Sequence, residues 1–178
     1  MQALLIIDMQ MDMQHRIERG LDCVNPETAE RITALAAQFR AQGKPVVHIR
    51  HRDDIPDSPV HRDAPGFPPQ PCDLALDGEK VFEKQTSSGF AGTGLAEWLR
   101  AEGLTDLVVT GAVAGFCVNS TVRAGADLGF RMTVVQDAVL GFGLPDAGLS
   151  AQVIFDVTLA HLAADFASLV NTESLLAD

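Results

Sequence analysis

Three side chains with the chemistry of a covalent hydrolase lie far apart in the chain. Asp8 follows an apolar run at 3–7, Lys84 ends a short segment, and Cys117 ends a glycine-containing turn at 111–117. A thiolate can attack a carbonyl carbon, and a carboxylate can take the thiol proton and pass it to a leaving amine. An ammonium and a helix N-terminus both lower a thiol pKa. The three residues predict a cysteine hydrolase with an activated Cys117, provided that the fold brings them together.

The segments around these residues alternate between strand and helix patterns. Short apolar runs indicate strands that are buried on both faces, and apolar residues spaced about 3.6 apart indicate helices between them. The sequence Asn-Pro-Glu at 25–27 predicts the start of the first helix, with Asn25 as N-cap. Further helices are expected to begin near 93, 118 and 146, and strands are expected at 3–7, 45–49, 81–84, 106–110, 131–136 and 167–170.

Repeated strand–helix units predict one α/β domain, residues 1–178, with a parallel sheet covered by helices on both faces. Ligands bind such sheets at the carboxyl ends of the strands. Asp8, Lys84 and Cys117 each end or follow a predicted strand, so we expect them at one edge of the sheet. The proline-rich segment 52–80 is predicted to be a long irregular loop, of the kind that often carries function in compact domains.

The composition disfavours several classes of partner. The chain has 178 residues, 47% of them hydrophobic, and a formal net charge of −11, which disfavours nucleic acid and anionic membrane surfaces. No stretch approaches the roughly 20 apolar residues of a membrane span, and the first residues do not match a secretory signal. The three cysteines, Cys23, Cys72 and Cys117, fit no disulfide framework. We expect a cytoplasmic homo-oligomer, a dimer or higher, that acts on a small molecule.

The histidines and aromatic residues near the predicted site have two interpretations each. The spacing of His48 and His51 points them to opposite faces of a strand, which is poor geometry for metal binding. It favours a buried His48 and a loop His51. The alternative places His51 at the rim of the pocket, in contact with substrate. Phe90 and Phe116 could be apolar walls of the pocket or residues of the core.

Four segments, in order, resemble the isochorismatase-like cysteine hydrolases. Leu5 to Gln10 resembles the family's opening strand, which ends in Asp-Met-Gln, and residues 81–95 resemble its lysine segment. Residues 110–121 resemble the family's nucleophile turn, and residues 129–138 continue the match. The resemblance covers nearly the whole chain. It implies a Rossmann-like, three-layer α/β/α sandwich with a six-stranded, mainly parallel sheet.

The same resemblance implies the residues of the site. Asp8, Lys84 and Cys117 would form a catalytic triad, and a cis peptide bond would join Ala112 to Val113. The backbone amides of Val113 and Cys117 would form the oxyanion hole, which stabilises negative charge on the carbonyl oxygen. The substrate pocket is expected to include Gln10, Met13, His51, Phe90 and Phe116.

The nicotinamidase branch of the family binds a metal through an Asp-x-His motif, whereas this chain has the reverse order at 51–53. We therefore expect no metal and no cofactor. The expected function is hydrolysis of a C–N bond in an amide-like substrate through a thioester on Cys117, with Asp8 as general base and acid and Lys84 orienting the group. The alternatives are isochorismatase-type vinyl-ether hydrolysis, nicotinamidase activity, and a non-catalytic binding protein on the same fold.

Overall fold

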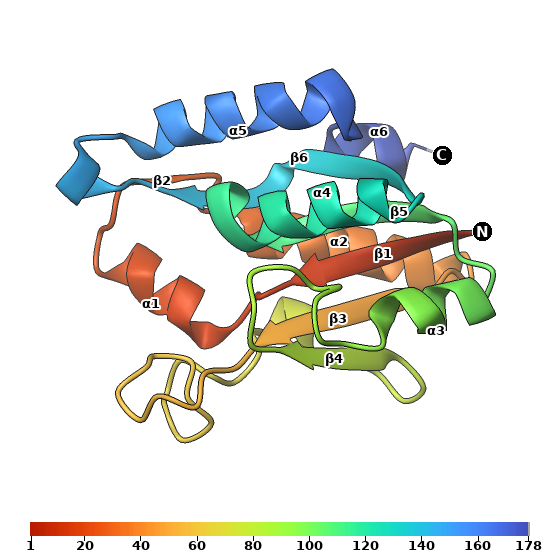
Figure 1. The fold of residues 1–178 in the computed structure, drawn as a ribbon, viewed down its shortest axis with the longest axis horizontal. Coiled ribbons are helices and arrows are strands. Elements are labelled where there is room, and N and C mark those ends of the chain that lie inside the picture. The colour runs from red at the N-terminus through yellow and green to blue at the C-terminus, as the bar shows by residue number, and fades with distance from the viewer. Residues whose placement is uncertain (178) are drawn as a thin grey trace.

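The computed structural model describes residues 1–177 and contains a seven-stranded sheet between two layers of helices (Figure 1). The strands lie in the order β2-β6-β5-β1-β3-β4, and β7 also pairs with β6. Among the strand pairings of residues 1–177, only that of β2 with β6 is antiparallel. The strands are β1 (Gln2–Ile7), β2 (Cys23–Val24), β3 (Val46–His51), β4 (Lys80–Lys84), β5 (Asp106–Ala112), β6 (Arg131–Phe142) and β7 (Ala167–Val170).

The helices lie between these strands and are amphipathic or apolar on the side that meets the sheet. The α-helices are α1 (Met11–Glu18), α2 (Thr28–Ala41), α3 (Leu95–Ala101), α4 (Asn119–Asp127), α5 (Ala151–Asp165) and α6 (Thr172–Leu176). Short turns are the 3-10 helices η1 (Pro71–Asp73) and η3 (Pro145–Ala147) and the π-helical turn η2 (Ala114–Val118). None of the helices within residues 1–177 is both long enough and apolar enough to cross a membrane.

β1 shows why the fold has three layers. Residues 3–7 are all fully buried, and alternate side chains point to opposite faces of the sheet. Leu5 and Ile7 pack in the core under α3, α4 and α5, whereas Leu4 and Ile6 pack in the core under α1, α2 and α6. A strand that is buried on both faces must have helices on both sides. The predicted three-layer α/β/α architecture is confirmed.

The prediction of six strands is wrong by one. The additional strand, β2, has two residues and pairs with the far end of β6, which runs on to Phe142 rather than ending near 136. Asn25 is not the predicted N-cap: it has φ 59°, and its side-chain amide donates to the carbonyl oxygens of Gln136 and Val139 at 2.9 and 2.8 Å. These bonds hold the middle of β6, so Asn25 supports the sheet instead of starting a helix.

Three helices also differ from the sequence-based expectation, among them α6, which was not predicted. α1 was not predicted, and it begins after a link of only three residues from the apolar strand β1. The last long helix begins at Ala151, not near 146, because residues 145–147 form a separate 3-10 turn. The hydroxyl of Ser150 accepts the N–H of Val153 at 3.3 Å and caps the helix there.

The segment 52–79 is mostly irregular, as predicted, and lies beside α1 at the lower left of Figure 1. A buried network holds its last part against β3. The ring of His48 lies 2.6 Å from Asp73 Oδ1 through Nδ1 and 3.0 Å from Glu79 Oε2 through Nε2. Arg40 donates two hydrogen bonds to the Glu79 carboxylate, at 2.7 and 2.9 Å. His48 is fully buried, as expected, and its role in this network is structural.

Candidate active site

The order of the strands brings four polar side chains to one edge of the sheet. β5, β1, β3 and β4 lie side by side with parallel pairing, so their carboxyl ends share that edge. Asp8 follows β1 directly, and Cys117 lies in the π-helical turn after β5. His51 and Lys84 end β3 and β4 and are partners in register. The fold thus brings together the three predicted residues and adds His51.

Lys84 lies at the centre of this cluster, with a side chain that is 0% exposed. Its Nζ is 2.8 Å from Asp8 Oδ2, 3.0 Å from His51 Nδ1 and 3.3 Å from Cys117 Sγ. An ammonium has three N–H donors, so these contacts engage all of them. A buried charge is tolerated when it is paired. The carboxylate of Asp8 supplies the countercharge.

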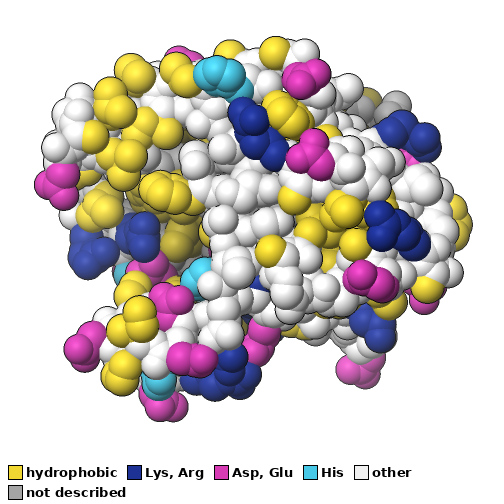
Figure 2. Space-filling model, in the orientation of Figure 1, with side chains coloured by type: hydrophobic (Ala, Val, Ile, Leu, Met, Phe, Trp, Pro, Cys, Tyr) yellow, Lys and Arg dark blue, Asp and Glu magenta, His cyan; other side chains and the backbone are white. Residues whose placement is uncertain are grey.

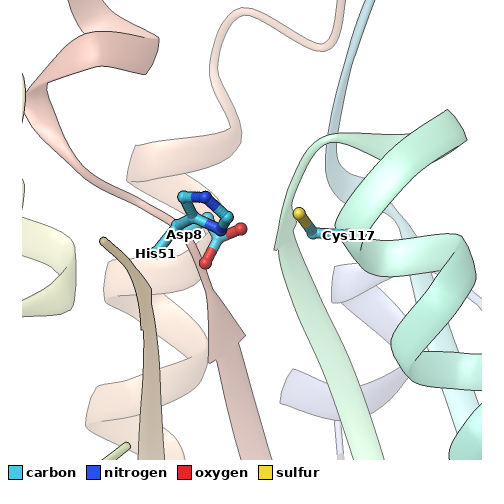
Figure 3. A group of neighbouring side chains, drawn as sticks. All are labelled: Asp8, His51 and Cys117. Atoms are coloured by element: carbon cyan, nitrogen blue, oxygen red, sulfur yellow. The ribbon is translucent and has the colours of Figure 1, made fainter. Parts of the chain in front are cut away.

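Asp8 leaves β1 in the left-handed backbone region, with φ 51°. This conformation is uncommon for residues other than glycine and often marks a functional site. The backbone N–H of Asp8 donates to the carbonyl oxygen of Ile49 at 2.8 Å, which fixes the turn. Asp8 Oδ1 is buried and has no hydrogen-bond partner among residues 1–177. Figure 3 shows the sulfur of Cys117 facing the Asp8 carboxylate across the edge of the sheet.

The thiol of Cys117 is protonated in this arrangement. Burial raises its pKa to about 12, and the negative charge of Asp8 acts in the same direction, whereas Lys84 lowers it. The sequence-based expectation of a lowered pKa is wrong, because it counted the helix N-terminus and the Lys84 ammonium but neither the burial of the thiol nor the charge of Asp8. The resting site holds a thiol, a carboxylate and an ammonium, so the thiol needs a base to become a nucleophile.

The turn that carries Cys117 is built on close contact between β5 and β1. Gly111 has φ 114°, and a Cβ at this position would collide with the carbonyl oxygen of Ile7. Only glycine fits there. The next peptide bond, Ala112–Val113, is cis, at the position that the resemblance implies. The Val113 carbonyl then accepts the N–H groups of Phe116 and Val118, at 3.0 and 3.3 Å, and closes the turn.

A pocket of about 550 Å³ opens over Asp8 and Cys117. Figure 2 shows hydrophobic side chains gathered above a hollow at the left of the view, over the protruding segment that follows β3. Four of the five residues that were predicted to line the pocket do so: Gln10, Met13, His51 and Phe116. The prediction for Phe90 is wrong. Its ring stacks on Phe130, with centroids 5.5 Å apart, and packs against the core on the α4 side.

The pocket also contains residues that the sequence interpretation missed. Asp12 and Arg16 form an ion pair of 2.8 Å on α1, and they were missed because that helix was missed. Residues 85–87 follow β4 directly, so the rule that sites lie at strand ends could have found them. The remaining missed positions are Asp53, Ser58, Pro59, Val60, Ala112 and Val113. The last two were predicted to form the cis peptide bond, but they were not predicted to line the pocket.

Asp8, His51 and Cys117 offer ligand atoms within 4.8 Å of one another, the only such group of three among residues 1–177. The donor set does not fit a metal, because Lys84 Nζ already contacts one atom of each of the three residues. A second cation among them would be repelled at short range by a buried ammonium. The Lys84 ammonium is therefore the cation that Asp8, His51 and Cys117 surround.

Comparisons with known proteins agree with this geometry. The chain matches the model of the isochorismatase domain over residues 2–160. It is 32% identical over 181 residues to the uncharacterized isochorismatase family protein YrdC of Bacillus subtilis (strain 168), covering 99% of this chain and 95% of that protein. A crystal structure of an isochorismatase-family protein from Chromobacterium violaceum superimposes with a TM-score of 0.92 at 32% identity, covering 99% of this chain and 92% of that one.

Two relatives with named activities match over shorter stretches. Streptothricin hydrolase of Streptomyces noursei is 35% identical over 152 residues, which cover 82% of this chain and 52% of that protein. N-carbamoylsarcosine amidase of an Arthrobacter species is 40% identical over 63 residues, which cover 35% of this chain and 24% of that protein. This chain therefore spans about half of the first enzyme's length and aligns with about a quarter of the second.

Proposed function

This chain belongs to the isochorismatase family of hydrolases, and we propose that it hydrolyses a C–N bond in a small amide-like substrate through a thioester on Cys117. One observation carries the proposal: the buried Lys84 ammonium contacts Asp8 and Cys117 at once, while Asp8 Oδ1 has no partner among residues 1–177. The names of the two shorter-matching relatives, a hydrolase and an amidase, support the same reaction class.

Acylation begins with the protonated thiol. Asp8 takes the proton from Cys117 Sγ as the sulfur attacks the carbonyl carbon, and the carbonyl π electrons move to the oxygen. When this oxyanion collapses, the C–N bond breaks and Asp8 passes the proton to the departing nitrogen. The amine leaves, and the acyl group stays on Cys117 as a thioester. Because the pKa of the thiol is raised to about 12, the thiol needs Asp8 to take its proton before or as the sulfur attacks.

Deacylation uses the same groups in reverse. A water molecule attacks the thioester carbonyl while Asp8 takes its proton, and the C–S bond then breaks. The thiolate of Cys117 takes the proton back, and the product acid is released. Lys84 stays charged and keeps Asp8 in place throughout. The backbone N–H groups of Val113 and Cys117, which both line the pocket, would donate to the oxyanion in each step.

The test is a panel of primary amides, lactams, N-carbamoyl compounds and nicotinamide in buffer with chelator, assayed for release of ammonia or amine and, for the lactams, for the ring-opened amino acid. A 1-carboxyvinyl ether is included and assayed for release of a 2-oxo acid. For any amide that is cleaved, mass spectrometry of acid-quenched enzyme should show the acyl adduct on the peptide that contains Cys117. The variant Cys117→Ala should lose both the turnover and the adduct.

The matched control is Cys72→Ala, at a cysteine outside the pocket, which should retain turnover. Amide cleavage that survives in Cys117→Ala would contradict the mechanism. Cleavage of the vinyl ether with no amide cleaved would contradict the substrate class.

A further inference from the structure

His51 joins the proposed catalytic group to a carboxylate outside it. Its ring Nδ1 lies 3.0 Å from Lys84 Nζ, and its Nε2 lies 3.1 Å from Asp53 Oδ1. We propose that His51 is a positioning residue that holds the Lys84 ammonium against Asp8 and Cys117, and that Asp53 sets the tautomer this requires. The inference rests on the proposed function, since it assigns a role to His51 through the proposed catalytic lysine.

The donors of Lys84 fix the state of the His51 ring. An ammonium can only donate, so Nδ1 must accept, and the ring proton must then lie on Nε2. That proton points at Asp53, whose carboxylate can only accept. A carboxylate that accepts from one ring nitrogen of a histidine keeps the proton on that nitrogen and leaves the other nitrogen free to accept. The geometry therefore specifies a neutral His51 with its proton on Nε2.

Asp53 is itself held as an acceptor. Ser58 Oγ donates to Asp53 Oδ2 at 2.7 Å, so the two carboxylate oxygens have different partners. This hydrogen bond lowers the pKa of Asp53, although burial acts against it, and the contact with His51 lowers it further. The carboxylate is thus ionised at neutral pH. Lys84 thus donates to His51, His51 donates to Asp53, and Ser58 donates to Asp53 from the loop, so the donated hydrogen bonds converge on the Asp53 carboxylate.

The backbone of His51 is fixed as well as its ring. Gln10 accepts the N–H of His51 at 2.8 Å through Oε1 and donates to its carbonyl oxygen at 2.9 Å through Nε2. Gln10 also donates to the carbonyl of Phe67 at 2.8 Å, which ties the loop to the same point. The pairing of β3 with β1 ends at Ile49, so on that side these bonds take the place of strand pairing at His51.

A direct role on substrate would require a free ring nitrogen. His51 lines the pocket, but both of its nitrogens are engaged inside the protein. Lys84, by contrast, is fully buried, so a lost acceptor there cannot be replaced by bulk water. The arrangement favours action through Lys84.

The substitutions that separate these roles follow from side-chain length. Asparagine places an acceptor near the position of Nδ1 and can keep the contact with Lys84. Glutamine reaches the position of Nε2 and can keep the contact with Asp53 alone. We expect the rate of Cys117 alkylation by iodoacetamide, at fixed pH and read by peptide mass spectrometry, to fall on the order of tenfold in His51→Gln and to stay within about twofold in His51→Asn. His161→Gln, on the exposed face of α5, is the matched control and should have no effect.

A second measurement reads the tautomer of His51 directly in the wild-type protein. Nitrogen-15 spectra of histidine-labelled wild-type protein at pH 7.5, with His51 assigned by its loss in His51→Asn, should show a proton on Nε2 and none on Nδ1. In Asp53→Ala, which removes the acceptor of the Nε2 proton, the preference for this tautomer should weaken. A proton on Nδ1 in the wild type overturns the proposal, and so does alkylation that is equally fast in the wild type and His51→Gln. Neither measurement uses a substrate, so failure to find amidase activity would count against the proposed function and leave this inference standing.

Discussion

Lys84 Nζ lies 2.8 Å from Asp8 Oδ2 across 76 positions of sequence, and the two side chains are 0% and 8% exposed. The carboxylate and the ammonium act in opposite directions on the third member of the site, because Asp8 raises the pKa of Cys117 and Lys84 lowers it. Burial and Asp8 outweigh Lys84, so the nucleophile is kept as a thiol until its proton is taken.

Removing the lysine should destabilise the fold, because it leaves Asp8 as an unpaired buried charge. We expect Lys84→Met to lower the free energy of unfolding by about 3–5 kcal/mol, and the double variant Asp8→Asn with Lys84→Met to recover most of that loss. Urea denaturation measures both. Lys80→Met, at the exposed start of the same strand, should change stability by less than about 0.5 kcal/mol. A double variant no more stable than the single one would show that charge pairing is not the cause.

Replacing the base should make the nucleophile more reactive even as it stops catalysis. Without the charge of Asp8, Lys84 acts alone, so the pKa of Cys117 should fall from about 12. We expect iodoacetamide to alkylate Cys117 at pH 7.5 on the order of tenfold faster, or more, in Asp8→Asn than in the wild type, since each unit of pKa changes the thiolate fraction tenfold. The wild-type rate should still be rising at pH 10. Cys23, outside the pocket, is the internal control, and slower alkylation in the variant would contradict the assigned role of Asp8.

The network around His48 should give the protein an acid-sensitive component of stability. Burial alone would raise the pKa of Glu79, but hydrogen bonds from Arg40, the Leu76 amide and His48 lower it to about 2 from its ordinary 4.5. A lowered pKa stabilises the fold above the unfolded value, and that contribution is lost as the pH falls from about 5 toward 2.

Glu79→Gln tests this dependence. The variant should be less stable than the wild type by about 1–3 kcal/mol at pH 6, and the difference should shrink toward pH 3. Denaturation curves at several pH values measure the difference, with exposed Glu97→Gln as the control. A difference that is constant with pH would mean that packing, rather than ionisation, explains the loss.

The glycine before the cis peptide should be the least replaceable glycine of the site. In Gly111→Ala the added Cβ meets the carbonyl oxygen of Ile7, and the positive φ adds strain, so we expect a loss of more than about 4 kcal/mol or no folded protein. Gly129→Ala shares a positive φ but has open space around the position, and it should cost only about 1–2 kcal/mol. Thermal melts of the two variants make the comparison, and equal losses would point to backbone conformation instead of the contact with β1.

The amino-acid sequence alone predicts those features of this protein that have local physical causes. A five-residue apolar run such as 3–7 must be buried on both faces, and alternation of such runs with helical periodicity leaves few folds besides a covered parallel sheet. The carboxyl ends of parallel strands meet at one edge, so the placement of Asp8, Lys84 and Cys117 after strands was enough to predict that they converge. The two-residue strand β2 carries no periodicity and could not be found in this way.

The charge states of the site depended on tertiary structure. The pKa of Cys117 is set by burial and by a carboxylate 109 positions away in sequence, and neither quantity is a property of the turn around it. The same holds for His51, whose partners come from β4 and from the loop, and for Phe90, which packs on Phe130 and not in the pocket. Residue types and strand ends are encoded locally, whereas desolvation and electrostatic interactions depend on distances that only the folded chain defines.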